Sequence, residues 1–568
     1  MSVRNNFRNS LWKRRFLTAS RLLISGKIKD LGIKTVKFLK RVFKADSEIT
    51  YPQWRKKWVE LDASRRNQID GNILSLPSNL IFTIFLFVNA NNSLETQATI
   101  KSLIGQRYLK WNLQLLGDKS AVASIVKETD DSRVAYCNDS SFDQKKGWFS
   151  FLNSGDLLHE AALFVIAKSI IENPEAKVFY TDQDHVSTEG NFQDPFFKPN
   201  WNEDLFNGIN YFGIITVFSN ELWTENSHDP FETKGLGINE IAKIDKNHII
   251  HLPYVLASSP VHNDSSCLKL EAQRIEYPLP SPAPKVSILI PTKNKGRMLE
   301  KCLQSLRNKT DYPDLEIIII DHESTEKYAR KIIDKAAEET DTKVIKYSGL
   351  FNFSAMINRA ATVASGGVFI LLNNDTEAVN SGWLKEMVEQ VSRSDVGIVG
   401  ALLVFNNETI QHAGVNPNSE GLMIHSHKHW KDNSPGYFGR LLVTHEVAAV
   451  TGACLAIKNE DWKKLGGLDE ENLAVAYNDI DLCFKARSRG LKVVLTPHAK
   501  LLHQESITRG FDDTSEKISR LNEELSVMQN RWQELLDEDP AYSVNLSYDK
   551  TSFINLADPP RTKPIWDC

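Results

Sequence analysis

Three acidic motifs follow one another in the second half of this chain. Asn-Asn-Asp at 373–375 ends an apolar run, Asn-Asp-Ile-Asp at 478–481 opens an amphipathic segment, and His503 follows a β-branched run. Carboxylates bind Mg²⁺ or Mn²⁺ together with phosphate oxygens, and a carboxylate beside a hydroxyl can remove its proton. The motifs therefore predict chemistry on a nucleotide diphosphate, with one Asp for the cation and another for the proton.

We assign the cation to Asp375 and the proton to Asp479, although each residue has a plainer alternative. Asp375 could belong to an ordinary turn, and Asp479 and Asp481 could be acids at a helix N-terminus. His503 could be a core histidine, but after a strand and near a diphosphate it is also a candidate metal or phosphate ligand. Arg509 is a candidate diphosphate partner, because a planar guanidinium matches phosphate geometry.

The composition indicates a soluble protein of two or three domains. Of the 568 residues, 41% are hydrophobic and 25% are charged, which are ordinary values for chains with real cores. No run of about 18 apolar residues is present, and we expect no secretory signal. The six cysteines form no C-x-x-C pair, which argues against a disulfide framework or a zinc ribbon and fits a reducing cytosol.

Residues 1–45 are strongly basic. They hold thirteen Lys and Arg against one Asp, a net charge of +12 in a chain whose total is −4. Trp12, Phe16, Phe38 and many aliphatic residues lie between these cations, a pattern that suits an anionic membrane surface. A disordered tail and a nucleic-acid arm are alternatives, but the apolar content is high for a solvated arm. We therefore predict peripheral attachment to the cytoplasmic face of the inner membrane, with no nucleic acid partner.

A strand–helix–strand pattern occurs twice, about two hundred residues apart. The predicted elements are Phe82–Val88, 94–106 and 111–116 in the first copy, and 286–290, 298–307 and 315–320 in the second. A duplicated unit of this kind predicts two similar α/β domains with mostly parallel sheets. Ligands of such sheets bind at the carboxyl ends of the strands, where Thr292, Asp321 and Asp375 fall.

We place the boundaries by composition and pattern. The predicted parts are a basic helical arm and lead-in at 1–77, a first domain at 78–278, a Pro-rich linker at 279–284, a second domain at 285–511, and a C-terminal helix and tail at 512–568. Residues 516–536 carry apolar side chains at three-four spacing. This predicts a helix docked on the domain surface, with a coiled-coil contact in a homodimer as the alternative.

The motifs in this order resemble the family 2 glycosyltransferases, which have the glycosyltransferase A fold. Longer stretches are similar to a bacterial subgroup that builds O-antigen, capsule and other surface polysaccharides; they lie at 351–359, 411–414, 435–440, 466–470 and 503–506. The resemblance covers roughly 78–560. It implies an inverting, metal-dependent hexosyl- or deoxyhexosyltransferase that takes a nucleotide-diphosphate sugar as donor and a glycan, lipid-linked where the chain is growing, as acceptor.

The resemblance also implies residue roles. Asp479 becomes the catalytic base, and Asp375 and His503 become the site of a divalent cation, Mg²⁺ or Mn²⁺. Nucleotide or donor contacts are implied for Pro291, Thr292, Asp321, Asn358, Asn373, Asn374 and Arg509. Possible acceptor contacts are His412, His427 and Asp481. Two positions depart from the family pattern: Asn373 replaces the first acid of the D-x-D motif, and Asn478 replaces the Glu that usually precedes the base.

The first domain departs further from the family. Its sequence at the D-x-D position is Asn-Ser-Gly-Asp at 153–156, and Gly-Asp-Lys at 117–119 follows its second strand. We find no clear base motif before the linker. Asp182 and Asp184 remain candidate functional residues. We favour the interpretation that this domain is a degenerate, structural copy, since fold alone does not imply activity.

Other classes fit less well. A sugar nucleotidyltransferase needs a Gly-rich loop after the first strand, where 291–296 offers one Gly. A catalytically weak polysaccharide-assembly scaffold would not need Asp375, Asp479 and His503 together, but Asn373 in place of the first acid keeps this alternative open. A processive membrane synthase would carry spanning helices and Q-x-x-R-W, and 529–532 is one residue short. His425, His427 and His429 would share one face of a strand, but without a Cys or carboxylate at zinc spacing a loop over the acceptor site is favoured.

Overall fold

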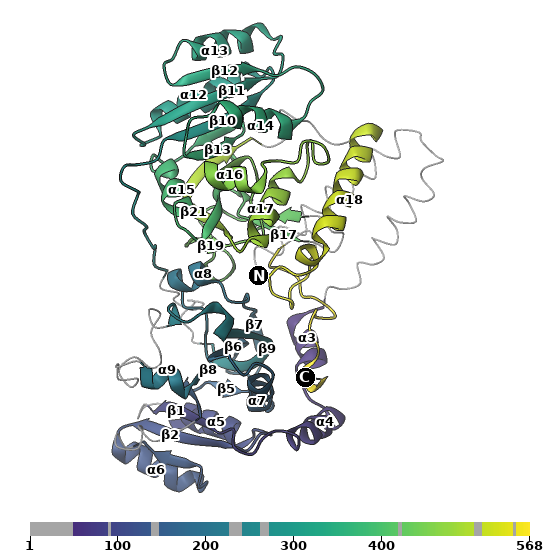
Figure 1. The fold of residues 1–568 in the computed structure, drawn as a ribbon. Helices are drawn as coiled ribbons and strands as arrows, with labels where there is room; N and C mark the ends of the chain where they lie inside the picture. Colours follow the sequence, from purple (N-terminus) through teal and green to yellow (C-terminus); the bar gives the residue numbers. More distant parts are fainter. Residues whose placement is uncertain are drawn as a thin grey trace. The chain divides into compact units, whose positions relative to one another are not determined.

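The computed structural model describes most of the chain (Figure 1). The described residues are 49–88, 93–137, 147–225, 241–261, 272–417, 423–504, 514–548 and 552–567. The chain divides into two units, Met1–Thr50 and Tyr51–Cys568, and the description below concerns the second unit. The basic arm up to residue 48 and the candidate Arg509 lie outside the described residues, so the expectations for them remain predictions.

The first sheet of the second unit is mixed. Its strands are β1 (Phe82–Val88), β2 (Trp111–Gly117), β3 (Val134–Tyr136), β4 (Trp148–Asn153), β5 (Leu157–Leu158), β6 (Val178–Val186), β7 (Phe192–Phe196), β8 (Thr216–Ser219) and β9 (Ile249–Pro260). They run in the order β3-β2-β1-β4-β8-β6-β9-β5, and β7 pairs with β6. The first four strands are parallel, as are β6 and β9. Helices between the strands are α5 (Ser93–Ile104), α6 (Lys119–Thr129), α7 (Ala162–Glu172), α8 (Glu203–Gly208) and α9 (Asn220–Glu225).

The second sheet repeats this plan. Its strands are β10 (Val286–Thr292), β11 (Leu315–Asp321), β12 (Thr342–Lys346), β13 (Val368–Leu372), β14 (Thr376–Ala378), β15 (Val396–Val404), β16 (Ile410–His412), β19 (His445–Glu446), β20 (Cys454–Lys458) and β21 (Lys492–His503). Their order is β12-β11-β10-β13-β20-β15-β21-β14, with β16 on β15 and β19 on β21. β17 (Val415–Pro417) and β18 (Met423–His425) form a separate pair.

Helices accompany the second sheet and flank both. They are α12 (Gly296–Asn308), α13 (Lys327–Ala337), α14 (Phe353–Val363), α15 (Trp383–Val391), α16 (Asn459–Leu465), α17 (Asn478–Ser488) and α18 (Ser515–Asp537). Ahead of the first sheet are α3 (Tyr51–Trp58) and α4 (Ala63–Ile73). None of the helices within the described ranges is both long and apolar enough to cross a membrane.

The duplication expected from the sequence is confirmed strand by strand. β3-β2-β1-β4-β8-β6-β9-β5 and β12-β11-β10-β13-β20-β15-β21-β14 have the same order, and each neighbouring pair has the same direction in both sheets. In both, the parallel half comes first in the chain and the antiparallel strands follow. The second unit thus contains two α/β domains of one topology.

The strands form where the sequence is β-branched and apolar on both sides. Val286–Thr292 and Leu315–Asp321 are buried almost throughout, as parallel strands covered by helices on both faces must be. Successive side chains alternate between two core clusters, because side chains of a strand point to opposite faces. Leu289 and Ile318 belong to one cluster, and Ile288 and Ile317 belong to the other.

Charged residues join the two domains. Arg393 contacts Asp204 of α8 at 2.7 Å, and both side chains are almost completely buried. Lys492 at the start of β21 contacts Glu203 at 2.5 Å and Asp395 at 2.8 Å. Buried ions that lose a partner destabilise a protein because the remaining charge is left without compensation. The contact between the two domains therefore depends on Glu203 and Asp204 of α8.

Replacing Asp204 by Asn should destabilise the protein. The variant leaves Asp395 as the carboxylate partner of Arg393 among the described residues, so we expect the unfolding free energy to fall by about 3 kcal/mol, as for loss of one partner of a buried pair. Glu460→Gln is the control, because its pair with Lys464 is exposed and such pairs contribute little. Denaturation of both variants measures the effect; equal stabilities would contradict it.

Candidate active site

The nucleotide-side candidates meet at the carboxyl ends of β10 and β11. Thr292 and Asp321 end these strands opposite each other in the parallel register. The Asn374 side-chain amide donates to Thr292 Oγ1 at 2.8 Å, and Asp321 accepts the Ser324 backbone N–H at 3.0 Å. Pro291, one residue before Thr292, is partly exposed at the same edge. The fold therefore brings these four candidates together, as the sequence predicts.

Asp375 and His503 are brought together by the pairing of β14 with β21. Thr376 lies opposite His503 in this antiparallel pair, and Gln504 N–H donates to the Asp375 backbone carbonyl at 3.1 Å. This register places His503 Nε2 at 3.3 Å from Asp375 Oδ1. Asn373 Nδ2 lies 3.4 Å from the same nitrogen. Residues about 130 positions apart in sequence thus form one polar cluster.

The His503 ring is oriented by a neighbour on β16. Its Nδ1 lies 3.2 Å from the Gln411 side-chain oxygen, which can only accept, so this contact favours the tautomer with the proton on Nδ1. The Nε2 lone pair then faces the Asp375 carboxylate. A nitrogen lone pair and a carboxylate oxygen side by side suit a divalent cation, and a hydrogen bond to the other ring nitrogen is the usual support of a histidine ligand. Asp375 and His503 therefore fit the cation that the sequence implied.

Asp479 lies in the first turn of α17 and is half-buried. Its Oδ2 accepts the Gly452 N–H at 2.7 Å, and its Oδ1 accepts the Ile480 N–H at 2.9 Å. Burial raises the pKa of this carboxyl, although the hydrogen bonds from Gly452 and Ile480 act in the opposite direction. A raised pKa makes the carboxylate a better proton acceptor.

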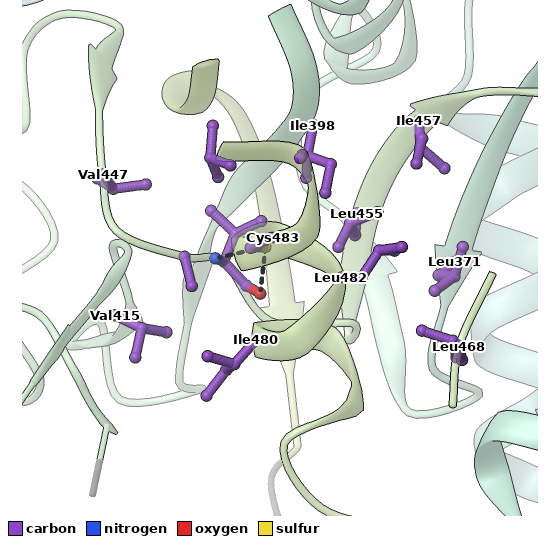
Figure 2. Packing of buried hydrophobic residues seen from close by; sticks show 14 of the residues in the cluster. Leu371, Ile398, Val415, Val447, Leu455, Ile457, Leu468, Ile480, Leu482 and Cys483 are labelled. Atoms are coloured by element: carbon purple, nitrogen blue, oxygen red, sulfur yellow. Dashed lines mark hydrogen bonds between the residues drawn. The ribbon is translucent and has the colours of Figure 1, made fainter. Parts of the chain in front are cut away.

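The apolar residues of α17 fix the place of Asp479. Ile480, Leu482 and Cys483 belong to the core cluster on one face of the second sheet. Figure 2 shows Leu482 and Cys483 near Leu455 of the sheet, and Ile480 further along the helix. Because the helix is buried against the strands, its first turn is held at a defined place.

A three-residue segment, Thr451-Gly452-Ala453, links the two sides of the site. Gly452 N–H holds Asp479, and the Ala453 carbonyl accepts the Asn373 N–H at 3.0 Å. Thr451 N–H donates to His412 Nε2 at 3.4 Å. One short stretch of backbone therefore connects Asp479, the expected proton acceptor, to the expected cation motif at 373–375.

α18 holds the segment around Asp479 from both sides. The buried Glu524 carboxylate accepts the N–H groups of Val475 and Ala476, at 2.9 and 3.0 Å, just before α17. Arg531 and Trp532 donate to Asp481 Oδ1 at 2.7 and 2.9 Å, just after Asp479. The predicted helix is thus confirmed as a docked one, and it lies beside α17 (Figure 1).

The two acids of 478–481 have different environments. Asp481 has no exposed surface, and besides Arg531 and Trp532 it contacts Lys485 Nζ at 2.9 Å. A carboxylate enclosed by three donors has no room for an acceptor. Asp481 therefore has a packing role in the structure in place of the acceptor contact that we expected, because Arg531 and Trp532 of α18 cover it.

Asn358 also has a structural environment. Its amide donates to the Leu468 carbonyl at 2.9 Å and to Glu470 at 3.0 Å, and its oxygen accepts the Leu468 N–H at 3.0 Å. Gly467 has φ of +66°, and a Cβ there would lie 2.8 Å from Asn358 Oδ1. These contacts explain the Gly-Gly-Leu-Asp-Glu sequence at 466–470, and they occupy the side chain that we expected at the nucleotide.

The histidine candidates are buried and held by other groups. His412 Nδ1 lies 2.8 Å from His425 Nδ1, and burial lowers the His412 pKa well below its usual value. His427 Nε2 accepts the Tyr437 N–H at 3.1 Å, and burial lowers its pKa likewise. His427 and His429 have positive φ and form a turn, so the three histidines do not share one strand face. His412, held by the 451–453 segment, is the one that lies next to the site.

The corresponding positions of the first domain differ. In the strand registers, Val88 takes the position of Thr292, and Gly117 takes the position of Asp321. In the β5–β9 pair, Ser258 takes the position that His503 has in the β14–β21 pair. Asp156 occupies the place of Asp375 and accepts the Asn153 N–H at 2.8 Å. The polar groups that define the second site are thus mostly replaced.

Asp182 and Asp184 of the first domain are bound within the protein. Asp184 accepts from Tyr51 and Arg55 of α3, at 2.6 and 2.9 Å. Asp182 accepts from His251 Nε2 at 2.8 Å and from Asn545 at 2.9 Å. Both carboxylates therefore anchor segments from outside the sheet, a role that no local sequence signal reveals.

Comparison with known proteins identifies the second domain. Residues 287–466 match the model of Glycosyl transferase family 2. This domain belongs to glycosyltransferase family 2. The resemblance inferred from the motifs is confirmed for the stretch that contains Thr292, Asp321 and Asp375.

Two curated relatives align with most of the chain. Uncharacterized protein y4gI of Sinorhizobium fredii is 32% identical over 512 residues, which are 80% of this chain and 56% of the relative. O-antigen biosynthesis protein RfbC of Myxococcus xanthus is 29% identical over 476 residues, or 73% of this chain and 36% of the relative. The chain therefore spans only about half and about a third of the lengths of these relatives.

A solved structure shows a weaker likeness. The mannosyltransferase PcManGT from Pyrobaculum calidifontis, in complex with GDP-Man and Mn²⁺, covers 44% of this chain and 64% of its own. The identity is 17% and the TM-score is 0.33. A likeness of this size says nothing about the ligands of this chain.

Removing the Glu524 charge should loosen the segment that carries Asp479. In Glu524→Gln the side chain can accept only one of the two N–H groups, so we expect the amides of Val475 and Ala476 to exchange with solvent about tenfold faster, as for loss of one charge-assisted hydrogen bond. Hydrogen–deuterium exchange measures this change. Glu523→Gln is the matched control, since Glu523 is exposed and bonds only to Ser519 on its own helix; equal exchange in both variants would contradict the role of Glu524.

Proposed function

We propose that the chain is an inverting, metal-dependent glycosyltransferase of surface polysaccharide assembly. A nucleotide-diphosphate sugar is the donor, and a hydroxyl of a lipid-linked, growing glycan is the acceptor. The observation that carries the proposal is the 451–453 segment, which joins Asp479 to the Asp375 and His503 cluster. The family 2 domain and the similarity to an O-antigen biosynthesis protein support it.

The residues divide the reaction as follows. Thr292, Asp321 and Asn374 hold the nucleotide at the strand ends. Asp375 and His503 would hold a divalent cation, which would supply positive charge for the departing diphosphate. The acceptor oxygen attacks the anomeric carbon from the side opposite the diphosphate, the bond to the diphosphate oxygen breaks, and Asp479 takes the hydroxyl proton. A single displacement of this kind inverts the anomeric centre.

Asp479→Asn should remove turnover and leave donor binding intact. An amide cannot accept the proton, so we expect kcat to fall about 10²–10⁴-fold, the usual contribution of a general base. Sugar transfer and thermal shift with a panel of nucleotide sugars measure the two properties separately. In the unmodified protein, activity should be lost as pH falls through the raised pKa of Asp479, because the protonated carboxyl is no longer a base. A variant with undiminished kcat would refute the assignment.

Asp375→Ala should abolish metal-dependent donor binding. Asn373 supplies only a neutral oxygen, so Asp375 is the one carboxylate of the motif available to the cation. With unmodified protein, Mn²⁺ should add about 2.7 kcal/mol of stability when the donor is at about 100 times its Kd, and EDTA should remove that gain. Glu377→Ala, two residues away and bonded to Gln504, is the matched control and should keep it. EDTA-sensitive donor binding by the Asp375 variant would place the cation elsewhere.

We also propose that the first domain is a non-catalytic copy. Val88, Gly117 and Ser258 stand where the second domain has Thr292, Asp321 and His503. Moreover, Tyr51 and Arg55 of α3 already occupy Asp184. The first domain therefore lacks the side chains that we propose for binding the nucleotide and the cation in the second domain.

The basic arm is proposed to hold the enzyme on the cytoplasmic face of the inner membrane. Each Lys or Arg near an anionic surface contributes about 1 kcal/mol, and the interleaved aromatic residues add apolar burial. Residues 1–45 should therefore bind phosphatidylglycerol vesicles, and high salt should loosen the protein without releasing it fully. Sedimentation of full-length protein and of a variant that lacks 1–45 measures this. Equal vesicle binding by both would rule out the anchor.

A further inference from the structure

A cavity of about 810 Å³ lies beside the last two turns of α18. Gln529 and Gln533 of α18 form one wall, and Asn200 and His251 of the first domain form another. Tyr542 and Tyr548 of the C-terminal segment line a third side, with ring centroids 5.4 Å apart. The volume falls within the range of small-ligand sites, about 300–1,000 Å³. None of the candidates of the active site lines this cavity.

The charges of the cavity disfavour an anion. Its two cations are already bound within the protein: Lys198 donates to the Thr181 and Phe212 carbonyls, and Arg561 donates to the Ser543 and Leu546 carbonyls. Three successive acids, at 537–539, line the same space. A phosphate or nucleotide would approach carboxylates and find no uncommitted cation among these residues, so its binding is electrostatically unfavourable.

The polar groups of the rim suit hydroxyl groups instead. Gln533 and Asn200 are exposed amides, each of which can donate and accept, and Asp537 offers a carboxylate held in place by Gln533 Nε2 at 2.8–2.9 Å. Tyr548 supplies an aromatic ring, and the guanidinium of Arg561 stacks on it at 3.6 Å from the ring centroid. Amides, a carboxylate and aromatic faces together match the alternating hydroxyls and C–H faces of a sugar ring.

We propose that this cavity binds a neutral oligosaccharide, the part of the acceptor glycan that lies away from the reacting hydroxyl. Gln529 and Gln533 are on the same helix as Glu524 and Arg531, which hold the segment that carries Asp479. A glycan bound in the cavity therefore contacts the same helix that holds the segment of Asp479 in place. The identity of the glycan as the acceptor rests on the proposed function, whereas the binding of a neutral glycan does not.

The test uses the full chain and a turnover-independent readout. Neutral oligosaccharides of two to six sugars, released from the surface polysaccharide of the source strain and separated by size, are titrated while saturation-transfer NMR detects binding. Inorganic phosphate and a nucleoside monophosphate serve as anionic probes. The double variant Gln529→Ala/Gln533→Ala should bind the oligosaccharides about tenfold more weakly, as expected for two lost hydrogen bonds. Asn530→Ala is the matched control, because Asn530 is exposed on the same helix and does not line the cavity.

Each outcome decides the proposal. Weaker binding in the double variant, with unchanged binding in Asn530→Ala and in Asp479→Asn, supports it even if no transferase activity is found. Equal binding in the double variant and the control, no saturable binding of any oligosaccharide, or preferential binding of the anionic probes overturns it. Loss of turnover in Asp479→Asn reports on the proposed function alone, so the two hypotheses fail independently. Circular dichroism of the double variant excludes a loss of fold as the cause.

Discussion

The hydrogen bond from Gly452 N–H to the Asp479 carboxylate is the interaction on which the site depends. It joins the first turn of α17 to the segment 451–453, and the next residue of that segment accepts the Asn373 N–H. Residues 452 and 453 form a turn that leads directly into β20, and these two hydrogen bonds connect it to both acidic motifs. A site built on strand ends and a buried helix is more precise than one built on free loops.

α18 strengthens that arrangement through hydrogen bonds that involve two carboxylates shielded from solvent. Glu524 and Asp481 are both buried carboxylates, and such groups are stable only when donors surround them. Each here accepts at least two hydrogen bonds, one set before Asp479 and one set after it. The helix therefore serves the site through contacts that have no direct role in proton transfer. Trp532, which lies at the kink of the helix, donates its indole N–H to Asp481.

The two domains show how one topology supports different chemistry. Their strand orders are the same, yet the positions that carry Thr292, Asp321 and His503 in one domain carry Val88, Gly117 and Ser258 in the other. Asp182 and Asp184 of β6 in the first domain bind the C-terminal segment and α3. Function depends on the side chains at the strand ends, so domains of one topology can differ in activity.

The sequence alone determined the duplicated α/β pattern, the strands that end at Thr292, Asp321 and Leu372, and the motifs of the second domain. Local signals suffice for these features, since apolar periodicity and short motifs are written in neighbouring residues. Only the tertiary structure decided that Asp481 and Asn358 are occupied by Arg531 and by Leu468, and that Glu524 supports the base. These contacts join residues 48 to 110 positions apart, and no pattern along the chain records which distant side chain a folded surface will bring beside them.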